Sequence, residues 1–420
     1  MKKRIILLLV LSLLLCGCAQ QPQATAAPTV PEVTEPTQIQ ETADPEKFRV
    51  NLELWVTEQS IWADEGLLKE MLASFAAYYP NITVNITHVS AGDLQDRMPD
   101  LLLSDADTLA ALASRGKTAE LAGLWAEIDD AYENVQKACG DGESFFALPV
   151  CVVADCMAVR IGDFEAAEAE KLINTVSHTW NGANFLKAAE NLLEAGKTNP
   201  LSIYCKDTSG DVHTRMLVEN FGGGRYVKTL SGTYQIESDA MTQALRSISE
   251  APGVILRRDL DAAGALEEFL AGDSAMVLCW NSQLQLLHGE DGEIVYMLPP
   301  SGGRARVYAK VFGLAVCENG DERQKAASMT LAAFLRDSGY AVRAAGQLPA
   351  RKSGLDAYKG TGLEARINDL SKLLSYMESG EIPGKNWEDA RKEWVLLLQN
   401  LADGKELAES IEACRAALEK

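Results

Sequence analysis

The sequence of 420 residues contains few of the side chains that most often form metal or catalytic centres. Its four histidines (His88, His178, His213 and His288) are scattered without metal-ligand spacing, and its nine cysteines include no C-x-x-C pair. The motifs G-x-S-x-G and H-E-x-x-H do not occur either. We therefore predict no metal site, no cofactor and no catalytic residue.

The sequence also contains fewer basic than acidic residues. Lysine and arginine number 39 against 60 aspartates and glutamates, which gives a net charge of −21. Such a chain repels phosphate groups, which argues against nucleic acid as a partner. The hydrophobic share of 47% and the charged share of 24% are ordinary for a folded soluble protein. They exclude a disordered chain, a collagen and a polytopic membrane protein.

The N-terminus carries an apolar run that is too short to cross a membrane. Residues 5–15 are apolar apart from Ser12 and follow three basic residues. As a helix they would span about 16 Å, about half of a hydrocarbon core of ~30 Å, which is typical of a signal peptide. The segment L-C-G-C at 15–18 resembles a bacterial lipoprotein signal, in which residues 1–17 are removed and Cys18 carries the lipid. The alternative is a plain signal peptide with two chance cysteines.

Residues 18–47 have the composition of a disordered tether. Within them, residues 19–47 hold five of the 14 prolines and no aromatic residue, so this stretch cannot bury a core. Removal of 1–17 takes away three basic residues, which leaves 36 basic and 60 acidic residues and a net charge of −24. We expect this form to be held on the extracellular face of a bacterial cell membrane by its lipid anchor alone.

Seven cysteines follow the tether. We expect them to be buried free thiols that behave as small hydrophobic residues, although an exported location would also permit a disulfide. They are Cys139, Cys151, Cys156, Cys205, Cys279, Cys317 and Cys414.

Strands and helices alternate after residue 48. Residues 50–56 alternate with period two, apolar residues follow at helical spacing between Asp64 and Pro80, and residues 82–87 alternate again. This pattern predicts a βαβ unit of a parallel sheet. Further strands are predicted at 100–103, 146–154, 156–159, 201–204, 275–280, 295–298 and 311–317, and further helices at 105–114, 180–193, 239–250, 262–270, 321–336 and from 386 onward. The alternation predicts an α/β fold.

Seven short motifs occur in an order that resembles one known family. They are a strand at 52–55, F-x-x-x-Y-P-x-I-x-V at 75–84, P-D-L at 99–101, L-P at 148–149, T-W at 179–180, F-x-x-G-x-x-A-M at 269–276 and G-x-L-P-A-R at 346–351. Together, behind a lipoprotein signal, they resemble the extracellular solute-binding proteins of ATP-driven (ABC) importers, in particular the group that binds sugars and oligosaccharides. The chain departs from the family pattern at 277–280 and 308–313, where glycines are usual.

The resemblance implies a periplasmic-binding-protein-like fold, with two α/β lobes joined by crossing strands and a ligand cleft between them. It places residues 48–153 and 299–338 in the first lobe, and residues 154–298 and the helical segment 339–420 in the second. It implies a non-enzymatic monomer that captures a solute, most simply a carbohydrate, and passes it to ABC permease subunits. The alternatives are another solute such as a polyamine, peptide or phosphodiester, a receptor that serves a sensor kinase, or a surface polysaccharide hydrolase.

Sugar recognition needs flat rings against C–H faces and planar polar groups against hydroxyls, so we sought such residues near strand ends. Four candidates have a plainer interpretation: Trp55 and Trp387 can belong to the core, and Asp105 and Asp107 can cap a helix. The candidate ligand-binding residues are Trp55, Glu58, Asp105, Asp107, Tyr204, Asp207, Trp280, Lys310 and Trp387.

Overall fold

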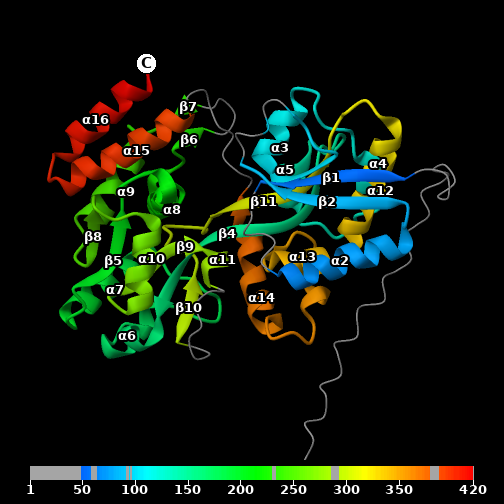
Figure 1. Cartoon of the computed structure of the whole chain (residues 1–420). Helices are drawn as coiled ribbons and strands as arrows, with labels where there is room; N and C mark the ends of the chain where they lie inside the picture. The colour runs from blue at the N-terminus through cyan, green and yellow to red at the C-terminus, as the bar shows by residue number, and fades with distance from the viewer. Residues whose placement is uncertain are drawn as a thin grey trace, which may run out of the picture.

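The computed structural model describes residues 49–57, 64–90, 94, 97–228, 233–284, 293–378 and 387–419. The signal peptide 1–17, the tether 18–47, the lipidation site Cys18 and the candidate Glu58 lie outside the described residues and stay predictions. The described chain forms two lobes that share one sheet, whose strands follow the order β2-β1-β3-β11-β4-β9-β5-β8 (Figure 1).

The first lobe begins with the predicted βαβ unit. Strand β1 (Val50–Val56) pairs in parallel with β2 (Ile82–His88) and with β3 (Leu101–Asp105). Helix α2 (Glu65–Tyr78) connects β1 to β2, and the Asp64 carboxylate caps it by accepting a hydrogen bond from the Leu67 amide. The remaining helices of this lobe are α3 (Ala106–Ala113), α4 (Ala122–Trp125), α5 (Glu133–Cys139), α12 (Glu322–Asp337) and α13 (Gly339–Ala345).

Two long strands run from one lobe into the other (Figure 1). Strand β4 (Leu148–Arg160) pairs with β11 (Val307–Val316) as far as Ala154, and with β9 (Ser274–Trp280) from Asp155 onward. The sequence predicted two strands at 146–154 and 156–159; they are one strand of 13 residues. Its length lets it serve both lobes, because its two halves have different neighbours in the sheet.

The second lobe is built on the second half of β4. Its sheet contains β5 (Asn199–Tyr204), β8 (Val254–Arg257), β9 and β10 (Ile294–Met297), and a separate hairpin joins β6 (Val227–Lys228) to β7 (Thr233–Tyr234). Its helices are α6 (Ile161–Ala166), α7 (Gly182–Glu194), α8 (Asp211–Val218), α9 (Asp239–Ser249), α10 (Ala262–Ala271), α11 (Asn281–Leu284), α15 (Trp387–Ala402) and α16 (Leu407–Leu418).

The segment after residue 339 differs from the predicted lobe assignment. Helix α13 packs against α2, and β12 (Leu348–Pro349) pairs with the first half of β4. The alanines of α13 are buried in that contact, which holds this stretch on the first lobe. The chain then passes through α14 (Glu364–Leu370) and β13 (Met377–Glu378), which pairs with β11, and returns to the second lobe at α15.

All seven cysteines after the tether are buried free thiols. Burial raises the pKa of the Cys205 thiol to about 12, so such groups stay protonated and unreactive. In the described part of the chain, no group of histidine, cysteine and acidic side chains could hold a metal ion. No described helix is both long and apolar enough to cross a membrane.

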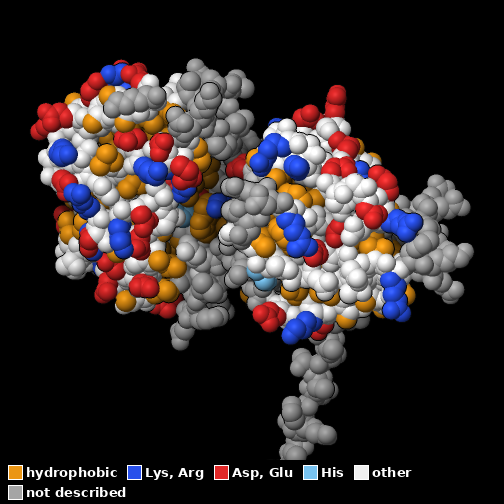
Figure 2. Space-filling model, turned by 45° about the horizontal axis from the view of Figure 1, so that its top comes forward, with side chains coloured by type: hydrophobic (Ala, Val, Ile, Leu, Met, Phe, Trp, Pro, Cys, Tyr) orange, Lys and Arg blue, Asp and Glu red, His pale blue; other side chains and the backbone are white. Residues whose placement is uncertain are grey.

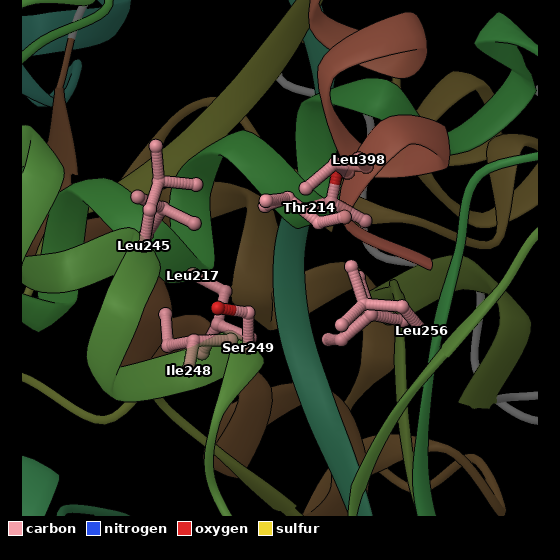
Figure 3. A pocket seen from close by; sticks show the side chains of 10 residues that line it. Thr214, Leu217, Leu245, Ile248, Ser249, Leu256 and Leu398 are labelled. Carbon is pink, nitrogen blue, oxygen red and sulfur yellow. The ribbon is translucent and has the colours of Figure 1, made fainter. Parts of the chain in front are cut away.

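A small apolar cavity lies inside the second lobe. It has a volume of about 10 Å³, and side chains of α8, α9, β8 and α15 surround it (Figure 3). Thr214 lies at its wall, and its hydroxyl accepts a hydrogen bond from the Trp394 indole N–H at 2.9 Å. Both side chains are buried, so this hydroxyl anchors α15 onto α8.

Substitution of Thr214 by valine is expected to lower the free energy of unfolding by about 1–3 kcal/mol, because the Trp394 N–H would be buried without a partner. Thr214→Ser keeps the hydroxyl and removes one methyl group, so it should cost only about 1 kcal/mol. Denaturant unfolding of the two variants measures the difference. A larger loss for serine than for valine would mean that the cavity, and not the hydrogen bond, governs this position.

Candidate functional site

The two lobes meet at the crossing strands, where Figure 2 shows a waist between two masses of the described surface. Three side chains come together there through strand register: Asp155 pairs with Trp280 across β4 and β9, and Lys310 pairs with Val153 across β11 and β4. Positions 153 and 155 share one face of β4, so all three side chains lie on the same side of the sheet. The Lys310 Nζ atom lies 5.5 Å from the centre of the Trp280 ring.

The Trp280 ring is partly exposed, and buried side chains of the second lobe hold it in place. The His213 ring of α8 meets it edge-on, with 4.7 Å between ring centres. The Nδ1 atom of His213 lies 2.5 Å from the Asp155 carboxylate, and both side chains are buried. This packing fixes the orientation of the indole and leaves part of it available for a ligand.

A second aromatic group lies at the start of α15. Trp387 stacks on Tyr234 with an interplanar angle of 11°, and the Arg215 guanidinium lies 4.8 Å from the centre of the Trp387 ring. The same guanidinium lies 6.0 Å from the ring of Tyr308 on β11, two residues before Lys310. The Tyr308 hydroxyl donates to the Glu219 carboxylate at 2.7 Å. These contacts link Trp387 to the same region as Trp280.

The first lobe brings hydroxyl and carboxylate groups to the carboxyl ends of β1 and β3. The Thr57 hydroxyl donates to the Ser104 hydroxyl at 2.6 Å. The neighbouring Asp105 accepts hydrogen bonds from the backbone N–H of Thr108 at 2.9 Å and from its hydroxyl at 2.8 Å. Asp105 is paired with Phe312, two residues beyond Lys310, so its carboxylate lies on the face of the sheet that carries Lys310, whereas Ser104 is paired with Gly313 and is buried on the other face.

Other candidates lie elsewhere. Trp55 is 8% exposed and has Arg97 over its ring, and Tyr204 is 3% exposed and donates its hydroxyl to the Leu278 carbonyl. The core interpretation that the sequence also allowed for Trp55 fits its burial, and Tyr204 is buried as well. Asp207 and Asp107 are exposed; Asp207 accepts a hydrogen bond from the Ser209 amide, and Asp107 lies in the first turn of α3.

The sequence did not identify the buried residues that position the two tryptophan rings, among them Asp155, His213 and Arg215. Asp155 did carry a signal, because it is a lone charge within the apolar stretch 146–159. The two residues on α8 had no such signal. Burial raises the pKa of the Asp155 carboxyl, and the nearby His213 partly offsets this rise.

Asp105 can be tested for its two roles separately. Asp105→Ala removes the N-cap of α3 and should cost about 1 kcal/mol of stability, whereas Asp105→Ser keeps a capping oxygen and should cost less. If the carboxylate also contacts ligand, both variants should lose affinity equally. Thermal unfolding together with a titration of the bound ligand measures both effects. Full affinity in the serine variant would restrict Asp105 to capping.

Comparison with known proteins gives one family match and many structural matches. The model of the family described as bacterial extracellular solute-binding protein matches residues 70–357. No curated protein sequence matches the chain. The GacH receptor of Streptomyces glaucescens, solved unliganded and with acarbose, has 16% identity and a TM-score of 0.67, over 89% of this chain and 100% of that one.

Two further structures have the same fold. Maltose-bound MalE3 of T. maritima has 16% identity and a TM-score of 0.67, over 88% of this chain and 99% of that one. UgpB from Mycobacterium tuberculosis, in complex with glycerophosphocholine, has 15% identity and a TM-score of 0.66, over 88% of this chain and 97% of that one. At such identities the likeness establishes the two-lobe fold.

Proposed function

Since this chain belongs to the bacterial extracellular solute-binding proteins, which bind solutes and are not enzymes, we propose that it captures a carbohydrate in the cleft between its lobes. The observation that carries this proposal is the partly exposed Trp280 ring at the crossing strands, with Lys310 beside it. An indole offers the flat apolar surface on which the C–H face of a sugar ring packs. Trp387 provides a second ring in the same region.

The polar groups of the first lobe complement the rings of the second. A sugar stacked on Trp280 presents its hydroxyls to its surroundings, and the partly exposed Asp105 carboxylate, on the sheet face that carries Lys310, is suited to accept hydrogen bonds from them. Because Asp105 and Trp280 belong to different lobes, a ligand that contacts both would favour the closed form. Structural neighbours solved with acarbose and with maltose support a carbohydrate as the solute.

The proposed function includes a place in the cell. The lipid on Cys18 and the tether 18–47 would hold a monomer on the extracellular face of a bacterial membrane, where it delivers the sugar to ABC permease subunits. The mature net charge of −24 does not favour nucleic acid as a partner. Labelling with a radioactive fatty acid, compared with a Cys18→Ser variant, tests the anchor.

A thermal-shift and calorimetry screen of the purified protein against mono- and oligosaccharides tests the proposed ligand class. A ligand at 100 times its Kd should stabilise the fold by about 2.7 kcal/mol, which gives a clear rise in Tm. The screen should include polyamines, peptides and phosphodiesters. A response to one of these and to no saccharide would reject the carbohydrate.

A further inference from the structure

The cations around the crossing strands differ in whether they have an acidic partner. Arg215 and Arg391 share the Asp211 carboxylate, at 3.0 and 2.8 Å. Two further cations, Arg225 and Arg306, share Glu378 of β13. Lys310 is different: within the described part of the chain, no carboxylate lies within 4.0 Å of its Nζ atom. The site therefore holds one positive charge that the described residues do not neutralise, although the whole chain has a net charge of −21.

The side chains around Lys310 determine where its ammonium group lies. Lys310 lies on a strand whose neighbouring side chains on the same face, Tyr308 and Phe312, are buried, while its own side chain is exposed. Tyr308 already donates its hydroxyl to Glu219, so it is not available to a ligand as a donor. The ammonium group of Lys310 instead lies against the Trp280 ring at 5.5 Å. A cation beside an aromatic face is held there by the ring quadrupole.

This contact affects what can bind to Trp280. His213 already packs against the indole, so a ligand that stacks on the ring must either displace the Lys310 ammonium or pair with it. A neutral sugar that displaces the ammonium loses the cation–π contact and gains no charge pair. A sugar that carries an anionic group replaces that contact with a charge-assisted hydrogen bond, which is stronger than a neutral one.

Resting on the proposed carbohydrate-binding function, we propose that the ligand is an acidic saccharide, whose ring stacks on Trp280 and whose carboxylate or phosphate pairs with the Lys310 Nζ atom. A lysine supplies a compact point charge without a fixed fork of donors, so both anions fit the geometry. The surrounding arginines are engaged by Asp211 and Glu378, which makes Lys310 the residue that distinguishes acidic from neutral sugars.

Calorimetric titration of the purified protein with matched sugars tests this proposal. The probes are glucose, glucuronate and glucose 6-phosphate, and the corresponding neutral and uronate disaccharides. We expect an acidic form to bind about tenfold more tightly than its neutral counterpart, and this preference should shrink as salt rises from 50 to 500 mM. The uronate and phosphate probes determine which anion is preferred.

Substitution of Lys310 separates this proposal from a general sugar site. Lys310→Gln should bring the affinity for the acidic form down to that for the neutral form, with no change in Tm because the side chain is exposed. The control is Lys137→Gln on α5, an exposed lysine that pairs with Glu133. Neutral and acidic forms that bind equally, or a Lys310→Gln variant that keeps the acidic preference, would overturn the proposal while leaving carbohydrate binding intact. Failure of every saccharide would overturn the proposed function itself.

Discussion

Replacement of Asp155 by alanine is expected to lower the free energy of unfolding by about 3–5 kcal/mol, because it breaks a buried pair and leaves one partner alone. Asp155 and His213 are 0% and 1% exposed, with 2.5 Å between the carboxylate and Nδ1. After the substitution the imidazole would have no acceptor at Nδ1 and would face a void. Equilibrium unfolding in urea measures the loss.

The matched control is Asp155→Asn. Its carbonyl oxygen can still accept a hydrogen bond from the His213 Nδ1–H group, its shape is nearly that of aspartate, and no charge is buried. The Asp155 Oδ2 atom has no hydrogen-bond partner among the described residues, so the amide replaces an oxygen that was not paired. We expect asparagine to cost less than about 1 kcal/mol. An equal loss in both variants would show that the ionised carboxylate itself is needed.

The pH dependence of this pair has a defined sign. Burial raises the folded-state pKa of Asp155 above its ordinary value of 3.8, so the folded protein binds this proton more tightly than the unfolded chain does. Relative to Asp155→Asn, the wild type should therefore lose stability as the pH rises from 3.8 through the raised pKa, and regain it as the pH falls. Unfolding of the two proteins between pH 3 and 8 measures this difference.

The position of Asp155 suggests why the chain retains such a costly group. Strand β4 changes its antiparallel partner from β11 to β9 between Ala154 and Asp155. The Asn281 side chain accepts a hydrogen bond from the Ala154 amide at this same point. Polar side chains thus fix the strand where it passes from one lobe to the other, and they also hold the Trp280 ring in place through His213.

The sequence predicted the elements whose patterns are local. The alternating strand β1, the capped helix α2 and strand β2 were predicted correctly because each follows from periodicity and capping. Strand β4 was divided in two because Asp155 interrupts an apolar run, and only pairing with His213 makes that charge compatible with a continuous strand. The return of 339–349 to the first lobe depends on contacts between distant segments, which no local pattern contains.

The sequence placed Trp280 at the end of a strand, as the structure has it, but placed Lys310 just before a strand, whereas Lys310 lies within β11. Trp280 and Lys310 could be identified separately, but their contact arises because β4 lies between the two strands that carry them. Trp55 was ambiguous from the outset, since parallel strands are buried on both faces. Helix α8 was not identified because its buried residues His213 and Arg215 are polar, and such residues usually indicate a solvent-exposed face.

Replacement of Trp280 by alanine is expected to weaken the affinity for the bound saccharide about 30-fold, equivalent to about 2 kcal/mol. The indole is partly exposed and is positioned by His213, so its loss removes the stacking surface more than it disturbs the core. Trp280→Phe keeps an aromatic face and should lose less than about fivefold. Calorimetric titration with the tightest-binding saccharide measures both variants, with thermal unfolding to confirm that each is folded.

The control for this experiment is Tyr78→Ala on α2, which removes an aromatic side chain that is 51% exposed and lies in the first lobe. It should leave the affinity unchanged, because a binding effect requires the ring at the crossing strands and not merely an exposed aromatic. The same titration with Trp387→Ala determines how far the site extends, since that ring is already in contact with Tyr234 and Arg215. Full affinity in Trp280→Ala together with a large loss in Trp387→Ala would move the centre of the site from β9 to the start of α15.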